Sequence, residues 1–106
     1  MKNILTYIEI KDGAPIKLSL EALSKASEIA IEKGNKSLAL ITEELKDDEL
    51  NKLRGAGASD IVVVKRDTYN MEDFSNIIVE VAKKYDCEDI FIPGTLDGKD
   101  LAPNVA

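Results

Sequence analysis

The chain contains no histidine, no tryptophan and a single cysteine. Without histidine, the commonest general base and the commonest metal ligand are both missing. One cysteine, Cys87, allows no internal disulfide, and the carboxylates of Asp86 and Glu88 beside it would raise the pKa of its thiol. We therefore expect no reactive role for Cys87.

Aromatic side chains are also scarce, with two phenylalanines and three tyrosines. The core must therefore be aliphatic, built from Ile, Val, Leu and Ala. A length of 106 residues is enough for one domain with a single core. The composition, 44% hydrophobic and 32% charged, is typical of a soluble globular protein.

Basic clusters and long apolar runs are missing as well. The chain has 20 acidic and 14 basic residues and a net charge of −6, which we interpret as a source of solubility. Nucleic acid and anionic membrane surfaces bind basic patches, so neither is an expected partner. We see no signal peptide and no membrane-spanning run, and we expect a cytoplasmic protein without direct membrane insertion.

What is present is a regular alternation of two kinds of segment. Short apolar runs rich in β-branched residues predict strands at residues 4–10, 37–42, 61–64 and 89–93. Apolar residues at helical spacing and acidic or basic ends predict helices at residues 20–33, 47–54 and 70–84, and a fourth beginning near Lys99. The run at 61–64 is apolar without alternation, which is typical of a strand buried on both faces.

Three local signals refine this assignment. Ser19 is predicted to cap the first helix, with Glu21 in its first turn and Gly34 as its stop. Gly55 and Gly57 follow a helix and precede a strand, the reverse of a dinucleotide fingerprint, so they are better explained as a helix end.

The strand and helix order predicts an α/β fold with an open parallel sheet and helices on both faces, in three layers. The chain stops at Ala106, inside the expected fourth helix, without a glycine or proline stop signal. We therefore expect a domain truncated at its C-terminal end, a fragment of a longer protein.

Ligands of such sheets lie beyond the carboxyl ends of the strands, where the candidate loops are residues 10–16, 42–46 and 94–99. The third is the most informative. Gly94, Thr95, Gly98 and Lys99 join a strand to a helix, where backbone N–H groups and the helix dipole could receive the phosphate of a nucleotide.

A structural explanation of the same loop stays open. Asp97 and Asp100 place negative charge where a phosphate would lie, and Asp97 can serve as the helix N-cap. The loop is not a Walker loop, because three residues rather than four separate Gly94 from Gly98. It is either a nucleotide loop or a capped turn.

Other polar residues carry less information. Acidic residues at positions 43, 44, 47, 48 and 49 lie at a helix start and are expected to be solvated. Glu9, between Ile8 and Ile10, has no catalytic partner that we can assign. No Ser/His/Asp, Cys/His or CxxC arrangement and no Ser-Gly-Gly loop of the ATP pyrophosphatases is present, so we expect no catalysis by this chain alone.

Several segments together resemble the electron transfer flavoprotein alpha family, which is also known from nitrogen-fixation electron carriers. The segments are residues 4–13, 18–26, 57–64 and 98–106. The last is the most specific: it reads Gly-Lys-Asp-Leu-Ala-Pro-Asn-Val-Ala, where the family typically has Gly-Arg-Asp-Leu-Ala-Pro-Arg-Val-Ala. Lys99 and Asn104 replace the two arginines of the family, and Pro93 replaces a glycine.

This resemblance covers essentially all 106 residues and implies a Rossmann-like fold of the adenine nucleotide alpha hydrolase type. It implies that residues 1–106 are the N-terminal domain of an alpha subunit, a scaffold that contacts a beta subunit in a heterodimer. The C-terminal domain that binds FAD would be absent from this chain. The beta subunit would hold AMP or a second FAD, and its counterpart here, the loop at 94–100, would usually be empty.

By the same resemblance, the parent flavoprotein carries electrons from flavin dehydrogenases to a downstream acceptor, and this chain is not an enzyme. The main alternative is an adenine-nucleotide-binding module of the universal-stress type, with ATP or AMP at the Gly94–Lys99 loop. A small standalone enzyme is a third possibility. Exposed sheet edges also predict that the isolated fragment forms a homodimer.

Overall fold

The computed structural model describes residues 3–65 and 71–92. Its strands are β1 (Asn3–Tyr7), β2 (Ile10–Lys11), β3 (Ala14–Pro15), β4 (Ser37–Ile41), β5 (Asp60–Val63) and β6 (Cys87–Phe91). Its helices are α1 (Lys17–Lys33), α2 (Asp47–Gly55) and α3 (Met71–Lys84). The predicted fourth helix and the start of the third near Asn70 lie outside the described residues.

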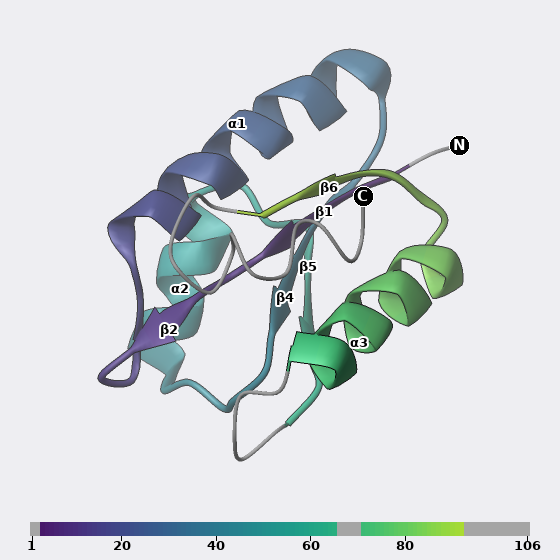
Figure 1. Cartoon of the computed structure of the whole chain (residues 1–106). Coiled ribbons are helices and arrows are strands. Elements are labelled where there is room, and N and C mark those ends of the chain that lie inside the picture. Colours follow the sequence, from purple (N-terminus) through teal and green to yellow (C-terminus); the bar gives the residue numbers. More distant parts are fainter. Residues whose placement is uncertain (1–2, 66–70, 93–106) are drawn as a thin grey trace.

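The main sheet has the strand order β5-β4-β1-β6, and every neighbouring pair in it is parallel. Helices α1 and α2 lie on one face and α3 lies on the other (Figure 1). The predicted three-layer α/β fold with a parallel sheet is confirmed. The side of the sheet that each helix takes follows from the right-handed crossovers that join parallel strands.

Alternate residues of the central strands feed two separate apolar layers. Toward α1 and α2, the buried side chains are Ile4, Ile8, Leu23, Ala26, Ala30, Ala39, Ile41 and Leu53. Toward α3 they are Leu5, Tyr7, Leu38, Leu40, Ile77, Ile78, Val81 and Ala82. Apart from Tyr7 all are aliphatic, as the composition predicted.

The first strand is shorter than predicted, because β1 ends at Tyr7 rather than at residue 10. The following residues form a separate antiparallel hairpin, in which Ile10 pairs with Pro15 and Lys11 with Ala14. Asp12 and Gly13 make its turn with φ angles of 54° and 77°, as a two-residue hairpin turn requires. The sequence did not indicate this break, because β1 and β2 are both extended and together form one apolar run.

The start of α1 is also different from the prediction. The helix begins at Lys17, its N-cap is Ile16 without a side-chain bond, and Glu21 lies beyond the first turn. Ser19 is therefore not the cap. It lies inside the first turn and is fully buried. Its hydroxyl accepts a hydrogen bond from the backbone N–H of Glu9 at 2.9 Å. The predicted stop at Gly34 is confirmed, with φ of 72°.

The largest correction concerns β5, which was predicted to be buried on both faces. It is an outer strand of the sheet, and the side chain of Val63 is 45% exposed. A continuous β-branched run indicates that a strand prefers apolar surroundings. Whether the strand is central or at the edge of the sheet depends on the order in which the crossovers place the strands.

Candidate functional site

The fold directs attention to the carboxyl edge of the sheet between β1 and β6. From β1 the chain proceeds through α1 to β4, whereas β6 lies on the opposite side of β1. Such a switch in strand order marks the place, beyond the carboxyl ends of the strands, where ligands of open α/β sheets commonly bind. The register aligns Thr6 of β1 with Phe91 of β6, so the two strands end at the same level.

On the β1 side, several backbone groups near the carboxyl edge bond within the chain itself. The N–H of Glu9 donates to the hydroxyl of Ser19 at 2.9 Å, and its carbonyl accepts from the N–H of Ile16 at 3.0 Å. In the first turn of α1, the N–H groups of Ser19 and Leu20 both donate to the carbonyl of Ile16, at 3.1 and 3.2 Å. The β2–β3 hairpin is thereby tied to the start of α1.

On the β6 side, the structure describes the chain as far as Ile92. Phe91 and Ile92 are both half-buried, and they pack against the apolar layers on opposite faces of the sheet. The predicted site residues Gly94, Thr95, Gly98 and Lys99, and the alternative cap Asp97, lie outside the described residues. Their role as a nucleotide loop or a capped turn stays a prediction.

The third candidate loop, at residues 42–46, leads into α2. The first turn of α2 contains Asp47, Asp48 and Glu49. Their negative charges interact favourably with the positive end of the helix dipole. Glu49 forms an ion pair with Lys52 at 2.6 Å, and Glu44 forms another with Lys65 at 3.5 Å. Within residues 3–65 and 71–92, no group of three or more acidic or thiol side chains is arranged to hold a metal ion.

Cys87 begins β6 and is half-buried. Burial, and secondarily the negative charge of Asp86, raise the pKa of its thiol from the ordinary 9.0 to about 11. The sequence predicted the direction from the flanking carboxylates, and the structure adds burial as the larger cause. At neutral pH the thiol is protonated and a poor nucleophile.

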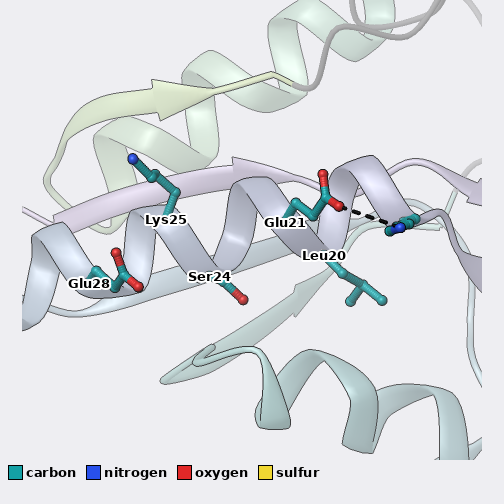
Figure 2. Close-up of a pocket in the computed structure, with 6 residues that line it drawn as sticks. Leu20, Glu21, Ser24, Lys25 and Glu28 are labelled. Carbon is teal, nitrogen blue, oxygen red and sulfur yellow. Dashed lines mark ion pairs between the residues drawn. The ribbon is translucent and has the colours of Figure 1, made fainter.

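A shallow groove of about 420 Å³ runs along the outer side of α1. Its lining residues are Lys17, Leu20, Glu21, Ser24, Lys25 and Glu28 (Figure 2). Leu20 and Ser24 project to one side of the helix and Glu21 and Lys25 to the other, and Lys17 pairs with Glu21 at 4.0 Å. The sequence gives no sign of this groove, because five of its six lining residues are polar and typical of the solvated face of an amphipathic helix.

A second hollow, of about 370 Å³, lies at the amino end of β5, away from the carboxyl edge. It is lined by Arg54, Ala58, Ser59, Asp60 and Ile61. The hydroxyl of Ser59 accepts a 3.3 Å hydrogen bond from the backbone N–H of Ser37, so it holds β4 and β5 together. We assign this hollow a structural role.

Three backbone donors of the described carboxyl edge are bonded within the chain and not available to a flavin. A flavin dinucleotide needs free backbone or side-chain donors for its pyrophosphate, and helix starts at a sheet's carboxyl edge commonly supply them. Here the donors of Glu9, Ser19 and Leu20 bond within the chain. These three groups cannot serve as pyrophosphate donors without breaking those bonds. Among the described helices, none is long and apolar enough to cross a membrane.

Sheet order and layers define the class of the protein: a three-layer Rossmann-like α/β domain. A structural comparison agrees, since the universal stress protein of Archaeoglobus fulgidus, solved in complex with dAMP, superposes with a TM-score of 0.61. The match covers 97% of this chain and 90% of that one at 16% sequence identity, which establishes the fold.

The chain belongs to the electron transfer flavoprotein domain family, whose pattern matches residues 4–106. The electron transfer flavoprotein subunit alpha of Thermoanaerobacterium thermosaccharolyticum is 30% identical over 99% of the chain, and that of Clostridium acetobutylicum is 27% identical over 99%. The resemblance to alpha subunits is thereby confirmed. The chain spans about a third of the length of these relatives, 33% and 32%.

Proposed function

We propose that this chain is the N-terminal scaffold domain of an electron transfer flavoprotein alpha subunit and performs no chemical step itself. The observation that carries the proposal is the family match over residues 4–106, together with alpha-subunit relatives aligned along 99% of the chain. In this role the domain contributes a rigid sheet and contact surfaces to a larger electron carrier.

The position of the flavin follows from the same proposal. On the β1 side the backbone N–H groups of Glu9, Ser19 and Leu20 bond within the chain, and the chain accounts for about a third of its relatives' length. FAD would therefore be held by a C-terminal domain outside these residues. Within this chain, the histidine-free sequence and the protonated Cys87 support the absence of a catalytic role.

The partner in this proposal is the beta subunit of the flavoprotein, with AMP or a second FAD bound on the beta side. Flavin dehydrogenases would supply electrons to the assembled heterodimer, which would pass them to a downstream acceptor. The support is the family itself, whose alpha subunits this chain resembles.

Two titrations test this proposal. In calorimetry, we expect the purified chain to give no binding heat with FAD, and to bind the purified beta subunit from the same organism. AMP serves as the control ligand for the beta subunit. Tight FAD binding by residues 1–106 alone, or no association with the beta subunit, would refute the scaffold role.

A nucleotide-binding module is the second candidate, favoured by the fold shared with a universal stress protein that was solved with dAMP. It would bind ATP or AMP at the Gly94–Lys99 loop. It predicts an adenine absorbance in the purified protein and a thermal shift on adding ATP, with both reduced in Lys99→Ala. A protein without adenine absorbance and without an ATP-dependent shift would exclude this function.

A further inference from the structure

The edge strand β5 combines a buried-strand sequence with an outer position. Residues 61–64 read Ile-Val-Val-Val, a run typical of strands covered on both faces and both edges. Yet Val63 is 45% exposed, and Ile61 and Val62 are half-buried. Natural edge strands usually carry charges, proline or bulges that block pairing, and the apolar stretch of β5 has none of these.

The backbone of β5 is suited to accept another strand. The N–H of Val64 donates to the carbonyl of Ile41 on β4 at 2.9 Å. Backbone groups alternate in direction along a strand, so the N–H and C=O groups of Ile61 and Val63 point away from β4, toward the side of β5 where the described part of the chain has no further strand. Ile61 and Val63, two positions apart, thus present backbone donors and acceptors to another strand.

Charge at the two ends of the run favours one orientation of that neighbour. Asp60 stands at its amino end, within 4.0 Å of Lys36, and Lys65 follows its carboxyl end. If two copies of β5 paired antiparallel about Val62, Asp60 of each copy would lie opposite the uncharged Val64 of the other, and the like charges would be at opposite ends of the pair. Parallel pairing would bring like charges together, which is unfavourable.

We propose that β5 pairs with β5 of a second copy of this chain, antiparallel and about a two-fold axis at Val62. In this register Ile61 of one copy lies opposite Val63 of the other, and each such pair exchanges both backbone hydrogen bonds. The exposed side of Val63 is then covered, and the two sheets become one continuous sheet. The inference goes beyond the proposed scaffold role and does not depend on it.

The size of this interface sets the expected strength. A strand of four residues buries less surface than the roughly 1,200–2,000 Å² of stable complexes, so the dimer is weak and depends on concentration. Sedimentation velocity across concentrations up to about 1 mM should show a shift from monomer to dimer.

The matched variants are Val63→Lys and Ile31→Lys. Both replace an exposed large apolar side chain with lysine, but Ile31 is 74% exposed on α1 and far from β5 in the sequence. V63K should weaken dimerisation by about tenfold or more, whereas I31K should leave it unchanged. Circular dichroism and thermal melting confirm that both variants are folded.

Hydrogen exchange on the unmodified chain gives a second readout that does not require V63K to fold. The amides of Ile61 and Val63 should exchange more slowly at high protein concentration, while amides elsewhere on the surface do not change. A monomer at all concentrations, a dimer that V63K leaves intact, or amides at 61 and 63 that exchange independently of concentration would overturn the proposal.

Discussion

Among the described glycines, Gly57 is the one at which a side chain would both strain the backbone and clash with a neighbouring residue. Its φ is +115°, and a Cβ placed there would stand 2.2 Å from the Oγ of Ser27 and 2.5 Å from its Cβ. The turn after α2 thus passes directly against α1. The sequence indicated a helix end at Gly55 and Gly57, but the contact with Ser27 needed the tertiary structure.

We expect Gly57→Ala to lower the free energy of unfolding by on the order of 3 kcal/mol, because α1 must shift and the backbone is strained. Gly55→Ala is the control, since a Cβ there meets nothing within 4 Å and the residue is the last of α2. It should be neutral or slightly stabilising. Urea titrations compare the two, and equal stabilities would contradict the packing argument.

The thiol of Cys87 provides a pH-dependent test at the same scale. With a pKa of about 11 instead of 9.0, the folded protein should contain about a hundredfold less thiolate at neutral pH than a free thiol would. Iodoacetamide should react correspondingly slowly, with a rate that rises toward pH 11. Asp86→Asn should lower the pKa slightly, because burial is the larger cause.

The same shift affects stability in a defined direction. The native state holds the thiol proton more tightly than the unfolded chain, so this contribution is complete below pH 9.0 and is lost as the pH rises through about 11.

Asn is a suitable replacement at position 86, where φ is 53°, because Asn tolerates the left-handed region. Rapid alkylation of the native protein at pH 7 would contradict the assignment.

At the scale of elements, the β2–β3 hairpin is the feature that distinguishes the loop after β1. It returns the chain so that Ile16 and Ser19 bond to the two backbone groups of Glu9. Contacts between β3 and α2 hold the hairpin from the other side. The start of α1 is therefore positioned by neighbouring segments rather than by a side-chain cap.

Replacing Ser19 with alanine should cost about 1–3 kcal/mol, since the partly buried N–H of Glu9 loses its acceptor. The hairpin amides should also exchange faster. Ser24→Ala, on the outer side of the same helix, is the control and should change neither property. If S19A and S24A behave alike in thermal melts and in hydrogen exchange, the hydroxyl of Ser19 does not position the hairpin.

At the scale of the whole molecule, two apolar layers share the central strands β1 and β4. This double burial makes the sheet a rigid platform, as expected for parallel sheets covered by helices. On the described β1 side, backbone N–H groups of Glu9, Ser19 and Leu20 at the carboxyl edge bond within the chain, whereas the β5 edge offers backbone groups for pairing. Assembly with the beta subunit and with a second copy is therefore expected to use the whole sheet, and calorimetry and sedimentation measure it.

Much of the fold could be predicted because local patterns in this chain agree with it. The stripe on α3 that includes Ile77, Ile78 and Val81 is buried, and Gly34 ends α1 as expected. The site was harder to predict. The hydroxyl of Ser19 bonds to a residue ten positions earlier, which no local capping pattern reveals. The nucleotide loop predicted at Gly94–Lys99 stays a prediction.

The sequence by itself determined the class of elements, their alternation, the aliphatic core and the family, because these depend on composition, periodicity and short motifs. Only the tertiary structure decided that β5 is an edge strand and that Ser19 ties the hairpin to α1. It also brought Ser27 against Gly57. These features depend on which segments become neighbours after the crossovers are made, and contacts between distant residues leave no periodic trace in the chain.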